Sequence, residues 1–194
     1  SNQLTSLDIS NNTLLTRLWA NNNELTSMDV TNNDTLVFLY LESNSLTTVT
    51  GVNDKTHLTY LQLKYNELTS LDLSGCTSMV ELAVSNNNLS SLDVTGCTAM
   101  VTIHAYNNEL TAIDLSTNDL LEQVNVNNNQ LTSIDVSDKP NLANLFVSDN
   151  QLTSIDVSNN PLLNQLNITS NQLTSLDISN NTLLTRLWAN NNEL

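Results

Sequence analysis

Apolar residues recur along this chain in one fixed pattern, which is clearest between residues 150 and 171. Leucine, isoleucine or valine occupies positions 152, 155, 157, 162, 163, 166 and 168, and polar residues fill nearly all the others. The pattern restarts every 21 residues, with one step of 22, so that turns begin at Asn2, Asn23, Asn44, Asn66, Asn87, Asn108, Asn129, Asn150 and Asn171. A unit this short has too little apolar surface to close a core alone, so we expect about nine turns stacked into a single solenoid domain over residues 1–194.

Each turn divides into two halves that both have the periodicity of a strand. In the first half, Leu7 and Ile9 alternate with polar residues, and in the second half Leu18 and Ala20 alternate with side chains that should point outward. An alternation of period two is typical of a strand with one buried side. Asn-Asn, Ser-Gly and Asn-Pro turn formers separate the halves. The pattern predicts an all-β or mostly β fold with two parallel sheets and little or no helix.

An asparagine stands at the start of every turn, where the backbone bends. Bends leave backbone N–H and C=O groups without partners, and a stacked amide side chain can bond the turns on either side of it. We therefore expect a structural ladder made of Asn23, Asn44, Asn66, Asn87, Asn108, Asn129, Asn150 and Asn171.

The repeat pattern of apolar residues and asparagine resembles that of a known family. The run Leu142-Ala-Asn-Leu145-Phe-Val147-Ser-Asp-Asn150-Gln-Leu152 resembles the leucine-rich-repeat motif, and the match recurs in every turn. The chain is similar to the bacterial class with 21-residue repeats and two nested strand halves. The resemblance implies that the variable strand face is a ligand surface, that the protein binds other proteins or acts as an adhesin, and that it is extracellular or on the cell surface.

Composition narrows the possible partners. The 20 acidic and five basic residues give a net charge of −15, which makes nucleic acid an improbable ligand because phosphate contacts need Lys and Arg. We expect no membrane insertion, since the chain has no apolar run of 18 residues. It also lacks a basic-then-apolar start, so we expect no secretory signal within it, although a mature chain would look the same.

Eight of the acids form one column of the repeat, namely Asp8, Asp29, Asp72, Asp93, Asp114, Asp135, Asp156 and Asp177. Unit charges about 4.8 Å apart repel one another by about 1 kcal/mol in water, so hydrogen bonds, counterions or bound calcium must offset the repulsion. The glycine-bearing calcium loops are missing, which favours hydrogen-bonded Asp side chains. Cys76 and Cys97 should also stack, either as two small apolar residues or, if the geometry allows, as a disulfide.

No catalytic constellation emerges from the sequence. His57 falls in a loop and His104 on a strand face, with no cysteine expected near either, and no cluster has the spacing of metal ligands. We therefore expect no enzyme activity, no cofactor and no metal.

The outward positions of the second halves vary most and hold every aromatic residue except Tyr65. They predict a ligand-binding face made of Trp19, Phe38, Tyr40, Tyr60, Lys64, His104, Tyr106, Phe146 and Trp188. A broad sheet face suits a protein or a glycan better than a small molecule. The alternative is that these aromatics only stabilise the sheet by cross-strand pairing.

Two parts of the array depart from this regularity. Turn three has Thr50 in place of the column Asp and carries the one inserted residue, which predicts a bulge or a longer loop. Residues 170–194 repeat residues 1–25 without a difference, outward positions included. Folding does not require that identity, so it records a copying event, and neither end has a polar capping repeat. An alternative function is therefore a structural segment of a surface fibre or filament, or a designed array, that stacks head to tail.

Overall fold

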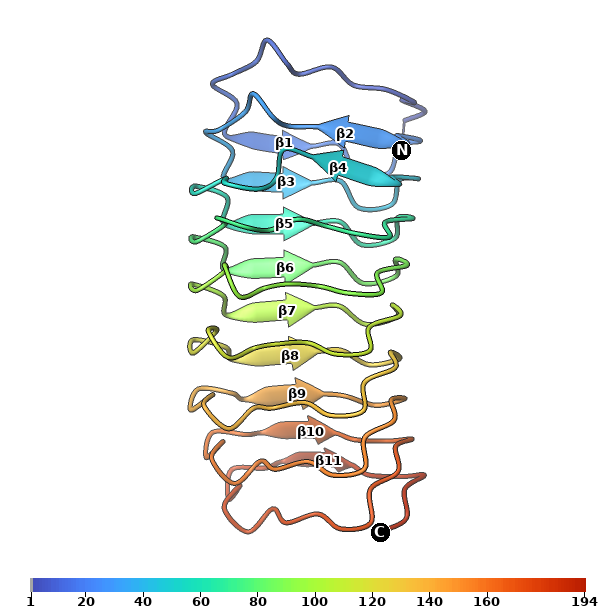
Figure 1. Cartoon of the computed structure of the whole chain (residues 1–194), viewed down its shortest axis with the longest axis vertical. Coiled ribbons are helices and arrows are strands. Elements are labelled where there is room, and N and C mark those ends of the chain that lie inside the picture. The colour runs from blue at the N-terminus through green and yellow to red at the C-terminus, as the bar shows by residue number, and fades with distance from the viewer. Residues whose placement is uncertain (1) are drawn as a thin grey trace.

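The computed structural model describes residues 2–194, so the first residue of the predicted domain lies outside the described part. It shows a solenoid with parallel strands and, in the described residues, no helix (Figure 1). No segment of this part is therefore a helix that could cross a membrane. The prediction of a mostly β leucine-rich-repeat solenoid with two parallel sheets is confirmed.

The larger sheet has nine strands, one from the second half of each turn. Its order is β1 (Arg17–Trp19), β3 (Phe38–Tyr40), β5 (Tyr60–Gln62), β6 (Glu81–Ala83), β7 (Thr102–His104), β8 (Gln123–Asn125), β9 (Asn144–Phe146), β10 (Gln165–Asn167) and β11 (Arg186–Trp188). Each strand is parallel to its neighbours and aligned without offset, as in the pair of Leu18 with Leu39. Equivalent positions of the repeat therefore form straight columns across the sheet.

The second sheet is much smaller than the sequence suggests. Only β2 (Ser27–Asp29) and β4 (Thr48–Thr50) pair, and the other first halves in the described residues form no strand. The pairing occurs where Thr50 interrupts the column of aspartates, and a hydrogen bond with the Thr50 side chain helps to lower the pKa of Asp29. Between most other neighbouring turns two carboxylates repel one another at this position, but Thr50 also neighbours Asp72 and no strand pair forms there, so repulsion alone does not explain the missing strands.

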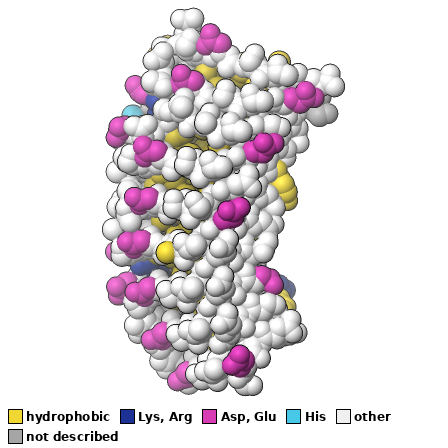
Figure 2. Space-filling model, turned by 45° about the vertical axis from the view of Figure 1, so that its right-hand side comes forward, with side chains coloured by type: hydrophobic (Ala, Val, Ile, Leu, Met, Phe, Trp, Pro, Cys, Tyr) yellow, Lys and Arg dark blue, Asp and Glu magenta, His cyan; other side chains and the backbone are white. Residues whose placement is uncertain are grey.

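The unequal pairing curves the molecule. Hydrogen-bonded strands must lie about 4.8 Å apart, whereas unpaired first halves are free to spread. The nine-stranded sheet therefore lies on the inner side of the curve. The end strands β1 and β11 recede behind the others in Figure 1, and the outline of the space-filling view is hollowed along one side (Figure 2). Such a curved sheet presents an extended concave surface.

Columns of aliphatic side chains fill the space between the two halves. Leu39, Leu61, Leu82 and Ile103 are fully buried members of one column, and equivalent columns of Leu and Val run beside it. These columns form one continuous cluster that extends from Ile9 to Leu173. Each internal turn thus buries its apolar side against two neighbours, which makes the sheet a stiff support for the side chains on its outer face.

Candidate functional site on the nine-stranded sheet

Four aromatic rings on the first three strands of the nine-stranded sheet contact one another. The rings of Phe38 and Tyr60 are stacked with centroids 4.9 Å apart and planes 5° apart. Tyr40 lies edge-on to Phe38 at 6.3 Å and to Trp19 at 6.2 Å. We call these four residues the aromatic cluster. Both geometries are favourable for aromatic pairs, so the side chains hold each other in place.

Charged groups surround the aromatic cluster. The Arg17 guanidinium lies 4.7 Å from the centre of the Phe38 ring, a cation–π contact. On the other side, Lys64 Nζ is 3.9 Å from Glu42 Oε2. Partial burial, together with the nearby Glu81 carboxylate, raises the pKa of Tyr40 above its usual value. The cluster is thus an apolar surface bordered by Arg17, by the Lys64–Glu42 pair and by the Glu81 carboxylate.

The remaining aromatics of the predicted face lie apart from the aromatic cluster. Phe146 and Trp188 have ring centroids 6.5 Å apart, towards the C-terminal end. His104 and Tyr106 belong to the middle of the sheet, where burial lowers the pKa of His104 and raises that of Tyr106. The predicted face therefore consists of three separate patches, of which the aromatic cluster is the largest.

The structure adds Tyr65 to the middle patch. Tyr65 is 55% exposed, and its backbone has a φ of +57°. The equivalent residues of the other turns also have positive φ, but they are the asparagines, serines and aspartate Asn22, Ser43, Asn86, Asn107, Asn128, Asp149, Ser170 and Asn191. Asn and Asp tolerate this backbone region, whereas a bulky side chain is strained there. The Tyr65 ring lies close enough to Tyr106 to be, after burial, the next contributor to its raised pKa.

The asparagine ladder has a definite hydrogen-bond pattern. In turn four, Asn66 Nδ2 donates to the carbonyls of Leu41 and Leu63, and Asn66 Oδ1 accepts from the backbone N–H of Leu46. Leu63 lies three residues before Asn66, whereas Leu46 and Leu41 lie 20 and 25 residues before it, in the adjacent N-terminal layer of the solenoid. The amide therefore bonds its own layer and the layer on one side of it, where the sequence analysis expected bonds to both sides. The same three bonds recur at Asn87, Asn129 and Asn150.

A second buried ladder, which the sequence analysis missed, runs through the loops between the halves. Its members are Asn33, Lys55, Cys76, Cys97, Asn118, Lys139, Asn160 and Asn181. Asn181 Nδ2, for example, donates to the carbonyls of Val157 and Asn160, both at 2.9 Å. The signal in the sequence is the Asn at this position in turns one, two, six, eight and nine, which also fits a simple turn-forming role.

Lysine and cysteine replace asparagine in this second ladder and still donate to backbone carbonyls. Lys55 Nζ reaches the carbonyl of Thr31 at 3.0 Å and the Asp34 carboxylate at 2.6 Å. Cys76 Sγ donates to the carbonyl of Val52 at 3.2 Å. Cys76 and Cys97 are buried and free, so the disulfide that the spacing allowed is not formed. Burial raises the pKa of the Cys76 thiol to about 11 and that of Cys97 to about 12, which suppresses thiolate chemistry.

Backbone hydrogen bonds stabilise the aspartate column. In all eight turns that carry it, Asp Oδ1 accepts from the backbone N–H two residues further on, as Asp8 does from Ser10 at 2.9 Å. Bonds of this kind lower the pKa of each of these carboxyls and offset the repulsion along the column. Within residues 2–194, no group of three or more His, Cys, Asp or Glu residues has a metal-binding arrangement.

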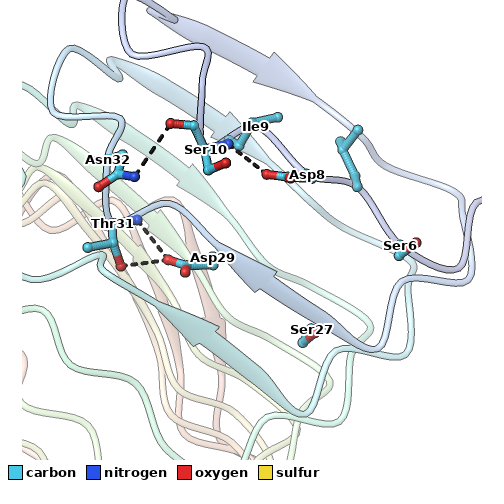
Figure 3. A pocket seen from close by; sticks show the side chains of 9 residues that line it. Ser6, Asp8, Ile9, Ser10, Ser27, Asp29, Thr31 and Asn32 are labelled. Atoms are coloured by element: carbon cyan, nitrogen blue, oxygen red, sulfur yellow. Dashed lines mark hydrogen bonds between the residues drawn. The ribbon is translucent and has the colours of Figure 1, made fainter.

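One hollow of about 290 Å³ lies away from the nine-stranded sheet, between the first halves of turns one and two (Figure 3). Ser6, Asp8 and Ser10 line it from turn one, and Asp29 and Thr31 from turn two. Figure 3 shows the carboxylates of Asp8 and Asp29 bonded within their own turns. The hollow exists because the first half of turn one forms no strand beside β2.

Comparison with known proteins identifies the class to which this solenoid belongs. No protein-family model matches the chain, and no curated protein matches it by sequence. Among solved structures, the functional domain of InlJ from Listeria monocytogenes, which includes a cysteine ladder, is 31% identical over 98% of this chain and 47% of that chain, with a TM-score of 0.78. YopM from Yersinia pestis, a leucine-rich effector protein, is 26% identical over 92% of this chain and 50% of that chain, with a TM-score of 0.82.

A plant structure shares the fold at lower identity. The peptide hormone receptor RGFR1, in complex with RGF2, is 22% identical over 95% of this chain and 33% of that chain, with a TM-score of 0.85. The present chain spans about half the length of the two bacterial proteins. With its 21-residue period and these neighbours, it is a leucine-rich-repeat protein of the bacterial type.

Proposed function

We propose that this chain is a non-enzymatic module that binds another protein through the outward face of its nine-stranded sheet. The observation that carries the proposal is the aromatic cluster, in which Arg17, Phe38 and Tyr60 form one stack with Tyr40 and Trp19 beside it. The same fold in RGFR1 occurs in complex with RGF2. An adhesive role outside the cell is part of this proposal and rests on the family resemblance.

The aromatic cluster has the properties of a binding hot spot. Trp, Tyr and Arg are the residues most enriched where truncation costs an interface at least about 2 kcal/mol. The four rings stand on strands fixed by the backbone pairing of β1, β3 and β5, so little conformational entropy is lost when a partner docks. Phe38 and Tyr60 hold each other in place before any partner arrives, which is a form of preorganisation.

The charges on the molecule indicate the character of the partner. The net charge is −15, and Figure 2 shows many more acidic than basic side chains over the visible face. Glu42 and Glu81 border the aromatic cluster, with Glu81 Oε1 accepting from Gln62 Nε2 at 2.7 Å. Complementary potentials steer encounter and set orientation. The partner that fits is a protein segment that presents apolar side chains flanked by Lys or Arg.

The test compares two triple variants on the same sheet. The aromatic variant lacks three rings of the aromatic cluster and carries Phe38→Ser, Tyr40→Ser and Tyr60→Ser. The matched control has three polar side chains of β8, β9 and β10 replaced and carries Gln123→Ser, Asn144→Ser and Gln165→Ser. Peptides from a displayed library would be selected on the unmodified chain, and their affinity for all three proteins measured by calorimetry. We expect the aromatic variant to lose at least about 100-fold in affinity and the control to lose little.

Circular dichroism and thermal melting of both variants complete the experiment. Loss of the fold in the aromatic variant would show that the rings are needed for sheet packing, which is the alternative stated from the sequence. A folded aromatic variant that still binds the selected peptides with unchanged affinity would contradict the proposal. Trp19 fluorescence, recorded with Trp188→Phe, provides an independent report on whether the cluster is the contact.

Tyr65 allows stability and binding to be separated at a single position. Replacing Tyr65 with Asn, the commonest residue at this position of the repeat, should relieve the strain of the positive φ and stabilise the fold by about 1 kcal/mol. If the middle patch belongs to the same binding surface, the variant should also bind the selected peptides more weakly. A variant that is more stable and binds equally well would limit the binding site to the aromatic cluster.

A further inference from the structure

The outward face of the nine-stranded sheet changes character along the solenoid. From β1 to β6 the outward positions include charged side chains, namely Arg17, Glu42, Lys64 and Glu81. From β7 to β10 none of them is Asp, Glu, Lys or Arg, and amides are the commonest side chains there. We call these amides the amide surface, which consists of Gln123, Asn125, Asn127, Asn144, Gln165 and Asn167. In a chain with a net charge of −15, such an uncharged surface favours a partner that is itself uncharged.

Backbone N–H groups hold the oxygens of three of these amides. Asn125 Oδ1 accepts from the N–H of Asn127 at 3.3 Å, and Asn127 Oδ1 accepts from the N–H of Ser148 at 2.7 Å. Asn167 Oδ1 accepts from the N–H of Thr169 at 3.1 Å. An amide held by its oxygen keeps two N–H donors for a ligand and loses little side-chain freedom when the ligand binds.

The middle patch, which adjoins the amide surface, contains two buried polar atoms without partners. Ser85 is fully buried, and neither Ser85 Oγ nor Asn86 Nδ2 has a hydrogen-bond partner in the described residues. The two tyrosines of the patch come from the layers on either side, since the N–H of Tyr65 donates to the Ser85 carbonyl and the N–H of Asn86 donates to the Tyr106 carbonyl. Buried polar groups nearly always have partners, so these two atoms mark a place where a ligand group is needed.

A chain of amides ends at one of these two atoms. Asn128 Nδ2 donates to Asn107 Oδ1 at 2.8 Å, and Asn107 Nδ2 donates to Asn86 Oδ1 at 2.7 Å. Each bond in such a chain polarises the next, which strengthens the N–H groups at its end as donors. Asn86 Nδ2 is that end, and the group that satisfies it must be an oxygen acceptor.

Tyr65 and Tyr106 enclose this donor. The Tyr106 hydroxyl lies near Ser85 and Asn86, whose proximity partly offsets the rise in its pKa caused by burial and by Tyr65. Tyr65 is largely exposed and has a strained positive φ, where most other turns have Asn, Ser or Asp. A side chain this exposed can turn aside at little cost in buried area, and backbone strain of this kind is concentrated at binding sites.

We propose that the middle patch and the amide surface together bind a neutral oligosaccharide built of hexose or N-acetylhexosamine units. One sugar ring lies between the side chains of Tyr65 and Tyr106, and its hydroxyl or acetamido oxygen accepts from Asn86 Nδ2. The following units extend over β8 to β10 and bond the amide surface, with Phe146 beneath them. This site is separate from the aromatic cluster and does not depend on its binding of a protein.

The chemistry of sugars matches both parts of this site. A sugar hydroxyl both donates and accepts, as an amide side chain does, so a row of amides can satisfy a row of hydroxyls. The C–H face of a sugar ring is apolar and packs on an aromatic ring, whose own polar tip remains free to hydrogen-bond. Burial lowers the pKa of His104, which favours its neutral form, so the site offers little positive charge to a sulfated or acidic sugar.

The experiment uses variants built from residues that the repeat already has at the same positions. The site variant carries Tyr65→Asn and Tyr106→Asn, which copy Asn86 and Asn127 of neighbouring turns. The probes are immobilised neutral oligosaccharides of hexoses and N-acetylhexosamines, with sulfated and sialylated oligosaccharides for comparison, and calorimetry then measures the affinity for those that bind. We expect the unmodified chain to bind neutral oligosaccharides and the site variant to lose at least about tenfold in affinity, which corresponds to one or two hydrogen bonds.

The two triple variants described above separate this site from the protein-binding surface. The variant that lacks Phe38, Tyr40 and Tyr60 should keep its affinity for the oligosaccharides while it loses the selected peptides. The variant with Gln123→Ser, Asn144→Ser and Gln165→Ser should keep the peptides but bind long oligosaccharides more weakly, with a smaller effect on a disaccharide. Circular dichroism checks the fold of every variant. If the site variant does not fold, Tyr106→Phe, which removes only a hydroxyl, takes its place and should still bind several-fold more weakly.

Three results would overturn the inference. The first is that no neutral oligosaccharide binds, or that the charged ones bind better. The second is that a folded site variant binds the oligosaccharides with unchanged affinity. The third is that the site variant loses the selected peptides and keeps the oligosaccharides, which would assign the middle patch to the protein-binding surface. Each of these results leaves the test of the aromatic cluster unaffected, so the two proposals can fail separately.

Discussion

Residues 1–25 and 170–194 have the same sequence but different surroundings, and the two segments differ in burial at most apolar positions. Leu25 is fully buried whereas its counterpart Leu194 is 57% exposed, and Leu4 is 44% exposed whereas Leu173 is fully buried. Each segment has one neighbouring turn, on opposite sides. Burial in this solenoid is therefore set by the adjacent turn and not by the residue itself.

Other features of the two segments are the same. Both form a three-residue strand, β1 and β11, at the same position of the repeat. Asp8 and Asp177 both accept a hydrogen bond from the backbone N–H two residues on, at 2.9 Å. Bonds within a turn persist wherever the turn is placed, whereas side-chain burial depends on stacking. The comparison separates local from nonlocal determinants within one molecule.

The largest expected difference concerns the leucine near the start of each segment. Leu173→Ala should lower the free energy of unfolding by about 2–5 kcal/mol because it leaves a cavity between turns eight and nine. The same change at Leu4, which is largely exposed, should cost less than about 1 kcal/mol. Urea unfolding monitored by circular dichroism measures both values. Equal losses would show that the isolated sequence, and not its neighbour, sets the contribution of this residue.

The second ladder provides the next test. Asn181 is buried and bonds two carbonyls of turn eight, whereas the identical Asn12 is exposed at the edge of turn one. Asn181→Ala should destabilise the fold by about 1–3 kcal/mol because buried carbonyls lose their donors. Asn12→Ala, the matched control, should stay within about 0.5 kcal/mol of the unmodified chain. If Asn181→Ala left the free energy of unfolding unchanged, water would have to take over the hydrogen bonds of the amide.

The two arginines should differ by a smaller amount. Arg17 lies over the Phe38 ring, whereas in the described residues Arg186 has no such ring partner. Arg17→Ala should therefore cost about 0.5–1 kcal/mol more than Arg186→Ala. Thermal melting of the two variants at equal ionic strength is the measurement. A larger loss for Arg186→Ala would contradict the assignment of the cation–π contact.

The aspartates should show the smallest difference. Backbone and side-chain hydrogen bonds from Ser10 lower the pKa of Asp8 below 3.8, and those from Ser179 do the same for Asp177. Because the folded pKa is the lower one, this contribution to stability is present above pH 3.8 and is lost as the pH falls through the folded pKa. NMR titration should give both carboxyls a pKa below 3.8. A value at or above 3.8 for only one of them would show that stacking, and not the local bond, sets it.

Much of the architecture could be predicted from the spacing of residues. Phe38 and Tyr60 are separated by one 21-residue period plus the inserted residue of turn three, so counting along the sequence places them side by side on adjacent strands. The register of the sheet follows from the same count. The asparagine ladder could be predicted because its position is invariant. The second ladder was harder to recognise because its residue type changes. Lys55 and Cys76 donate hydrogen bonds to backbone carbonyls there as asparagine does, although the three side chains have little in common.

The candidate site was predictable only in part. The register placed the aromatics on one face, but the division into three patches depends on which side chains reach each other across turns. Tyr65 was not recognised because its sequence position belongs to a bend, and only the positive φ and the exposure of the ring reveal it. The near absence of a second sheet was also unexpected, because alternation alone does not show whether neighbouring strands approach closely enough to pair.

By itself, the sequence determined the period, the strand positions and the inward-facing columns, because these follow from bonds within a turn and from the alternation of apolar and polar residues. Only the tertiary structure decided the curvature, the grouping of the aromatic side chains and the burial of each copy of the repeated end. Those properties arise between turns, where strand spacing, ring contacts and the presence of a neighbour determine the free energy, and one sequence can therefore be buried at one place and exposed at another.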